Sequence, residues 1–367
     1  MSPRTVGIEE ELFVVPTGRA ALAPSGEAVV AAAKESSDGD QFEHELKQEQ
    51  VELGTRPCEE LTDLERDVVA MRGELDRAAR ERGLRLVASG TAPFATRSHL
   101  TPAARYLRMA DEFGDVARSQ LTCGMHVHVG VASAEEGVAV LDRIRPWLAP
   151  LVALSSSSPF CDGRDTGYAS YRRVLWGRWP TAGETDVWGS LDSYRATTEK
   201  LIATGAALDE GMLYYDARLS RQYPTVEIRV CDVCIDPYDG VLLGGLIRAL
   251  VDTAADEWAA GVPPAAVPVA VLRAAGWRSA RHGMADRLVR FAADGSAQLR
   301  PAWTVVDELV AHVSPALDRA GDADRVREGL DRIRSRGTGA EVQRAAFERA
   351  GTMQAVVDAT TIGEVET

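Results

Sequence analysis

Gly7-Ile8-Glu9-Glu10-Glu11-Leu12, inside the run Thr5–Val15, is the most informative part of the sequence about the fold. The run is rich in apolar residues and reads as a β-strand, in which successive side chains point to opposite faces. Glu9 and Glu11 therefore share one face. A strand with two carboxylates on one face indicates a sheet that is covered on one side and open on the other.

Three further predicted strands place polar side chains on one face, opposite aliphatic ones: His126 and His128 in CGMHVHVG, Glu227 and Arg229 in TVEIRV, and Glu52 in QVELGT. Alternation alone is typical of any one-sided sheet. The residue types distinguish these strands, because carboxylates that converge cannot all stay ionised without cations. Mg²⁺ and Mn²⁺ prefer carboxylate oxygens, and Mn²⁺ accepts an occasional imidazole. The pattern favours a Mg²⁺ or Mn²⁺ site over a structural zinc site.

The arrangement of elements predicts an α+β fold with an antiparallel, half-exposed sheet backed by helices. No glycine-rich phosphate turn follows the first strand, which argues against a doubly wound parallel sheet. We predict a single catalytic domain, 1–367, in which 1–236 mix strands and helices and carry the site. The remainder, 237–367, is predicted to be mainly helical. Periodicity also predicts helices over Pro102–Ser119 and from Ser133 to about Leu154.

Ser155–Gly183 is predicted to be a long loop, rich in aromatic residues and arginines, that acts as a lid or binds substrate. Its arginines include Arg164 and Arg172, and arginine grips phosphate and carboxylate oxygens with a planar fork. No Gly-Lys dipeptide occurs, so a P-loop is excluded. Arg278 and Arg281 lie on one predicted helical turn, where nucleotide contact and a solvated helix face both remain open.

Charge and composition narrow the partners. With 41 Lys+Arg against 55 Asp+Glu, the net charge is −14, which repels polyanions, so we expect no nucleic acid partner. No apolar run approaches the ~20 residues needed to span a bilayer, and no leader sequence is evident, so we expect no membrane partner. Five scattered cysteines favour a reducing compartment, which predicts a cytoplasmic protein.

Several motifs, in order along the chain, resemble one known family: GIEEELFVV, QVELGTRPC, CGMHVHVGV, SPFCDGRDTGYASYR, TVEIRVCDV and GWRSARHGM. They are similar to the carboxylate–amine ligases of the glutamate–cysteine ligase type 2 group, which share a catalytic sheet with glutamine synthetase. The resemblance implies a curved antiparallel sheet of about six strands that binds ATP and Mg²⁺ (or Mn²⁺).

The resemblance also implies roles for individual residues. Glu9, His126 and Glu227 would hold one metal ion. Glu11 and Glu52 would hold another. Arg229 would contact phosphate, and Arg172 would bind a carboxylate or a phosphate. For nucleotide binding we add Arg164, Arg278 and Arg281 as candidates.

The implied activity is formation of an amide through an acyl phosphate, from the γ-carboxylate of glutamate and an amine such as cysteine. The substrates are therefore small molecules, and relatives suggest a homodimer. Two alternatives stay open: a metal-dependent hydrolase that uses the same Glu/His cluster without ATP, and a binding protein without turnover. Arg229 beside Glu227 favours a polyphosphate substrate over simple hydrolysis. The role of His128, ligand or neighbour of a ligand, also stays open.

Overall fold

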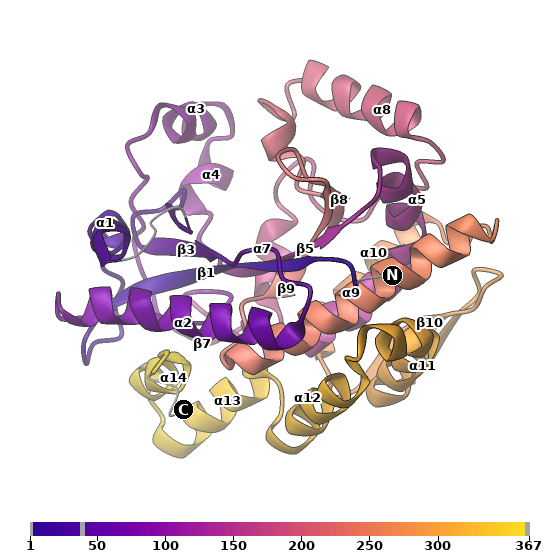
Figure 1. Ribbon diagram of the computed structural model, residues 1–367. Coiled ribbons are helices and arrows are strands. Elements are labelled where there is room, and N and C mark those ends of the chain that lie inside the picture. Colours follow the sequence, from indigo (N-terminus) through magenta and orange to yellow (C-terminus); the bar gives the residue numbers. More distant parts are fainter. Residues whose placement is uncertain (1–2, 37–40, 364–367) are drawn as a thin grey trace.

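The computed structural model describes residues 3–36 and 41–363, and Figure 1 shows a central sheet with helices on both sides. Its strands are β1 (Val6–Pro16), β2 (Phe42–His44), β3 (Gln50–Gly54), β4 (Leu84–Val87), β5 (Gly124–Gly130), β6 (Phe160–Cys161), β7 (Arg164–Asp165), β8 (Ala217–Leu219), β9 (Thr225–Asp232), β10 (Arg287–Phe291) and β11 (Ala297–Pro301).

The α-helices fall mainly between and after these strands. They are α1 (Gly26–Ser36), α2 (Leu61–Arg80), α3 (Ala104–Glu112), α4 (Asp115–Ser119), α5 (Ala134–Ile144), α6 (Leu148–Leu154), α7 (Tyr171–Trp176), α8 (Leu191–Ala203), α9 (Pro237–Ala259), α10 (Val269–His282), α11 (Ala302–Ala320), α12 (Ala323–Arg336), α13 (Gly339–Ala350) and α14 (Met353–Thr360).

The main sheet has seven strands and is antiparallel throughout. Its order is β2-β3-β1-β5-β9-β8, and β4 pairs with the second half of β1. The long strand β1 thus contacts three neighbours, with β5 along its first half and β3 along its middle. The predicted α+β class and the antiparallel sheet of about six strands are confirmed.

Strand register carries polar side chains into rows that cross the sheet. Glu9 lies opposite His126 on β5, and Glu11 lies opposite Glu52 on β3. His128 lies opposite Glu227 on β9. Because directly opposed residues of an antiparallel pair point to the same face, these side chains gather on one surface.

A bulge in β9 adjusts this surface. Met125 pairs with Cys231 and Val127 pairs with Ile228, so two β9 residues, Arg229 and Val230, stand opposite His126 alone. A bulge of this kind bends the strand and re-aims side chains, and such bulges are frequent beside functional sites.

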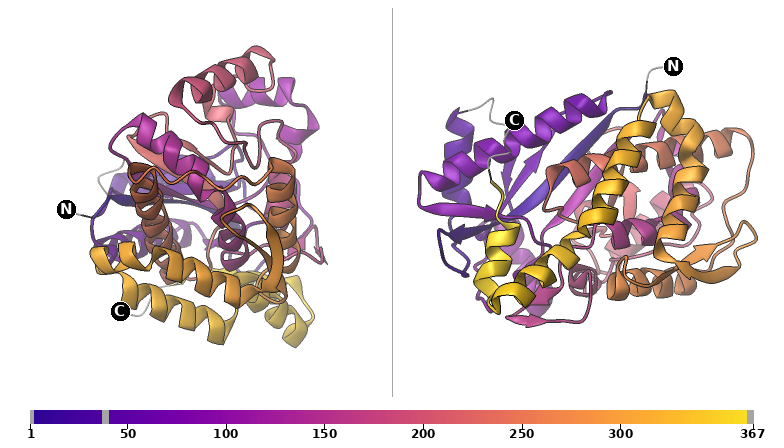
Figure 2. Two further views of the ribbon diagram at one scale, coloured as in Figure 1. Left: turned by 90° about the vertical axis from the view of Figure 1, so that its right-hand side faces the viewer. Right: turned by 90° about the horizontal axis from the view of Figure 1, so that it is seen from below.

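Helices cover the face of the sheet that lies opposite these polar side chains. In Figure 1 the long helices α2 and α9 run beneath the strands, and the view from below in Figure 2 shows the C-terminal helices as a further layer there. Ile8, Val127 and Ile228 point into this side and are at most 1 % exposed. The opposite face is only partly covered, by the arms that carry α3 and α8 (Figure 1).

Glu10 lies between two glutamates in the sequence, but its side chain points toward the helices and theirs point to the open face. It is fully buried and forms a two-point ion pair with Arg72 of α2, with both N–O distances at 2.7 Å. Arg72 donates its remaining hydrogen bonds to the carbonyls of Cys234 and Ile235. The pair connects β1, α2 and the segment after β9 at one point. If either partner were removed, the charge of the other would be buried without a partner.

Several predicted elements differ in detail. Gly114, with a φ of 57°, ends the helix expected over Pro102–Ser119 and divides it into α3 and α4. Pro146 similarly separates α5 from α6. The predicted loop Ser155–Gly183 contains β6, β7 and α7, and the C-terminal part contains the hairpin β10–β11 among its helices.

Within 3–36 and 41–363, no helix combines the length and the apolar character that crossing a lipid bilayer requires.

We predict that Arg72→Met destabilises the protein by about 3–5 kcal/mol, because Glu10 would remain buried without its partner. The double variant E10Q/R72M is expected to lose less, since it leaves no unpaired charge. Arg66→Ala, which breaks an exposed ion pair with Asp63, serves as the control and is expected to cost about 0.5 kcal/mol or less. Urea unfolding measures all three, and equal losses would show that the Glu10–Arg72 pair has no special weight.

Candidate active site

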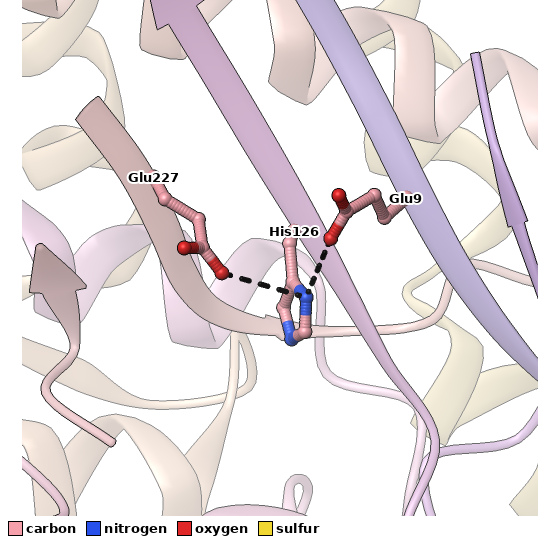
Figure 3. Close-up of side chains that lie close together, drawn as sticks. All are labelled: Glu9, His126 and Glu227. Carbon is pink, nitrogen blue, oxygen red and sulfur yellow. Dashed lines mark hydrogen bonds and ion pairs between the residues drawn. The ribbon is translucent and has the colours of Figure 1, made fainter. Parts of the chain in front are cut away.

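Three neighbouring strands bring Glu9, His126 and Glu227 together on the open face (Figure 3). His126 Nδ1 lies 3.3 Å from Glu9 Oε2 and 3.9 Å from Glu227 Oε1. Each residue can offer one ligand atom, and these atoms all lie within 4.8 Å of one another. We call these three residues the first triad. The structure brings together the residues that the sequence analysis grouped.

A second acidic group lies beside it. Glu11, Glu45 and Glu52 can each offer an oxygen within the same 4.8 Å limit, and we call them the second triad. Two of the three belong to the second predicted metal site. Glu45 follows the end of β2 and was not singled out from the sequence.

Two cavities open onto these triads. The first, about 390 Å³, contains both triads and is walled by aromatic residues and arginines. Its other lining residues include Arg105, Tyr106, Trp176, Tyr214, Arg218, Arg221 and Arg229. The second cavity, about 630 Å³, lies along the sheet beside Gly7, Gly54 and Gly130. The two cavities share Glu9, Glu52, His128 and Tyr223. They therefore meet at Glu9 of the first triad and Glu52 of the second triad.

The first triad is strongly polarised. Burial opposes ionisation of Glu9, but hydrogen bonds with His126 and His128 outweigh it and hold its pKa well below the ordinary value. Burial likewise opposes ionisation of Glu227, yet the charges of Arg229 and Arg218 lower its pKa to about 2. Both carboxylates are therefore ionised at neutral pH.

His126 is prepared to act as a neutral ligand. Burial, assisted by the charge of Arg229, lowers the pKa of His126 to about 4. Its Nε2 atom is buried and has no hydrogen-bond partner among the described residues. The other ring nitrogen, Nδ1, faces the two ionised carboxylates, and a neutral imidazole in that position fits a divalent cation.

The second triad differs in charge state. Burial and then the neighbouring Glu45 raise the pKa of Glu11 to about 8, and the same two causes raise the pKa of Glu52 well above its usual range. Three carboxylates so close cannot all ionise in the absence of a cation. This donor set contains only oxygen and fits Mg²⁺ or Mn²⁺.

His128 lies beside the first triad. Its Nε2 atom is 3.2 Å from Glu9 Oε1, and its Nδ1 atom is 3.0 Å from Thr225 Oγ1. Burial disfavours the charged form, but the contact with Glu9 outweighs it and raises the pKa of His128. The geometry favours His128 as a neighbour that orients Glu9.

Arg229 and Arg172 both lie at this site. Arg229 lines the first cavity and pairs with Glu227. Arg172 is buried behind it and donates from Nη2 to the Arg229 carbonyl at 3.3 Å. Gly124 makes this possible, because a Cβ there would come within 2.2 Å of Arg172 Nη2.

The other three predicted arginines lie elsewhere. Arg164 is exposed in the β6–β7 hairpin. Arg278 bonds to Asp286 and the Arg287 carbonyl, and Arg281 bonds to the Gly167 carbonyl. None of the three lines the two cavities, so the structure does not bring them to the acidic cluster, and a nucleotide contact there stays a prediction.

Arg218 is a site residue that the sequence analysis missed. It lies opposite Glu227 in the register of β8 and β9 and donates to both of its carboxylate oxygens, at 2.7 and 3.2 Å. It also donates to the carbonyls of Gly211 and Leu213. Its strand, β8, has only three residues, and the pairing of that strand with β9 does not follow from the sequence.

Comparison with known proteins places the chain among ligases. The family model described as glutamate-cysteine ligase family 2 matches residues 5–359. A curated relative from Frankia alni, named putative glutamate–cysteine ligase 2-2, is 47 % identical over 97 % of this chain and 95 % of its own.

Solved structures share the fold. A bifunctional glutathione synthetase from Pasteurella multocida has a TM-score of 0.71 at 16 % identity, over 97 % of this chain; the chain spans about half of it, 51 %. A glutamate–cysteine ligase from Francisella tularensis, in complex with AMP, has a TM-score of 0.69 at 14 % identity over 98 % of this chain and 88 % of that one.

We expect Mn²⁺ to bind more tightly as the pH rises through about 8, because Glu11 and Glu52 must release protons before they coordinate a cation. For each proton that Mn²⁺ displaces, the affinity of the second triad for Mn²⁺ should rise roughly tenfold per pH unit. Titration calorimetry in two buffers of different ionisation enthalpy counts those protons. Glu52→Gln should reduce the count, Glu308→Gln on distant α11 should not, and an unchanged count in E52Q would contradict the assignment.

Proposed function

The chain belongs to the glutamate–cysteine ligase family 2, and we propose that it is an ATP-dependent carboxylate–amine ligase that joins the γ-carboxylate of glutamate to an amine such as cysteine. The carboxylate oxygen attacks the γ-phosphorus of ATP, ADP leaves, and an acyl phosphate forms. The amine nitrogen then attacks the acyl carbon, the C–O bond to phosphate breaks, and phosphate leaves as the nitrogen loses a proton.

The observation that carries the proposal is the presence of two ligand triads and Arg229 in one cavity. Phosphoryl transfer between two anionic reactants needs cations between them, because phosphate and carboxylate repel each other. A hydrolase of an uncharged amide would not need the arginines that line this cavity. The alternative of a metal-dependent hydrolase is therefore not favoured.

The metal ions would be held by the chain's own carboxylates and one imidazole. Glu9, His126 and Glu227 would bind one Mg²⁺ (or Mn²⁺), and the second triad would bind another. When bound, the ions neutralise the phosphates and orient the γ-phosphate for in-line transfer. Arg229, which pairs with Glu227 in the structure, would be released toward the phosphate once a cation takes its place on that carboxylate.

The two cavities suit different substrates. The second cavity is the larger, and its floor at Gly7 and Gly54 carries no side chain, so we assign it to the nucleotide. The first cavity combines arginines with aromatic rings, so we assign it to the acid and the amine. They meet at Glu9 and Glu52, where the phosphate would pass from one substrate to the other.

The homodimer and the cytoplasmic location stay predictions.

A direct assay tests the activity. With ATP, Mg²⁺ and glutamate, we expect ADP release that depends on an added amine, measured for a panel of amines with mass spectrometry of the amide product. The mass of the product identifies the amine. Cleavage of an amide without nucleotide would contradict the proposal and support the hydrolase.

Glu9→Gln and Glu227→Gln are each expected to lower kcat by at least about a thousandfold, because an amide oxygen replaces an ionised ligand. The fold should persist, since neither side chain belongs to the apolar core. Glu308→Gln on α11 is the matched control and should keep wild-type turnover. Circular dichroism checks the fold, and full activity in both site variants would contradict the ligand roles.

A further inference from the structure

Trp176 contacts both arginines of the site with one ring. The Cζ atom of Arg172 lies 5.5 Å from the ring centroid, and that of Arg229 lies 5.8 Å from it. Arg172 precedes Trp176 by four residues on α7, so the two side chains lie on one face of that helix. Arg229 comes from β9. The indole is therefore the point at which α7 meets the guanidinium groups of the site.

Both guanidinium groups have unfilled hydrogen-bonding capacity. Arg172 is 2 % exposed and Arg229 is 7 % exposed. The Nε atom of each is buried and has no partner within the described part of the chain. A guanidinium has five N–H donors, and buried donors are nearly always paired. Two such groups side by side indicate that an acceptor with several oxygens, a phosphate or a carboxylate, completes the site.

The ring itself is held in place by Tyr214. Trp176 Nε1 donates to the Tyr214 carbonyl at 3.4 Å, and the Tyr214 ring meets the indole at 4.8 Å with an interplanar angle of 62°. Both aromatic residues line the first cavity. An indole fixed in this way offers its electron-rich face to a cation without moving itself.

Three carboxylates compete with a bound anion for the guanidinium of Arg229. Glu227, Glu9 and Glu11 all attract its guanidinium, and Glu227 already pairs with it. Without another partner, Arg229 would turn wholly toward these carboxylates and present no free edge to the cavity. We propose that Trp176 is a positioning residue, whose ring holds Arg229 and Arg172 so that Arg229 keeps donors aimed at an oxyanion in the first cavity. The proposal rests on the proposed function only for the identity of that anion.

The test measures binding of inorganic phosphate in the presence of Mg²⁺, by titration calorimetry, in the full chain. Wild-type protein should bind it, and Trp176→Leu should weaken binding by about tenfold because the ring is lost. Trp176→Phe keeps an aromatic face and should lose only about threefold. Trp188→Phe is the matched control, since Trp188 packs on Tyr194 and Tyr215 away from both arginines, and its affinity should not change.

A second readout separates positioning from general damage to the site. The affinity for Mn²⁺ should be the same in W176F and wild type, because the phenyl ring still holds Arg229 and the charge beside Glu227 does not change. If the ligase assay succeeds, KM for ATP or glutamate should rise more than kcat falls.

Three results would overturn the proposal: wild type that does not bind phosphate, Trp176 variants that bind it as wild type does, or a loss of Mn²⁺ affinity in W176F. If W176L does not fold, W176F decides alone, and unchanged phosphate binding in it overturns the proposal. Phosphate binding that depends on Trp176 in a protein without amine-dependent ADP release would leave the positioning role standing and remove only the proposed ligase reaction.

Discussion

Repulsion between carboxylates governs how the site and the sheet beneath it are built. Five glutamates, Glu9, Glu11, Glu45, Glu52 and Glu227, are confined to one cavity wall on the open face of a sheet. The protein answers this repulsion in two ways. Arginines and histidines hold the first triad ionised, whereas the second triad retains protons. A divalent cation can take the place of the arginines and histidines at the first triad and of the protons at the second.

The sheet supports this arrangement from below. Glu10 continues the acidic run of β1 but turns into the helix-covered side, where Arg72 neutralises it. The β9 bulge places two residues opposite His126, and Glu227 and Arg229, two positions apart on the strand, both face the open side. Chain segments distant in sequence thus reach one surface through strand pairing alone, and the helices beneath keep that pairing rigid.

Much of the site can be predicted from alternation along single strands. The faces of Glu9, His126 and Glu227 follow from period two, and their residue types point to a cation. Pairing partners do not follow from any one strand. Arg218 sits on a strand of only three residues, and Glu45 lies beyond the end of β2, so neither belongs to a pattern long enough to interpret. Arg164 illustrates the converse, because its strand β7 has only two residues, lies outside the main sheet and leaves the side chain exposed.

The meeting of the two cavities at only four shared lining residues has a consequence for the order of events. Molecules that arrive from either side do not have to pass one another, and neither has to leave before the other can enter. With the substrates assigned to the two cavities as proposed above, random addition would be the natural kinetic scheme. In the proposed reaction, the phosphorylated species would form where the two cavities meet, at Glu9 and Glu52.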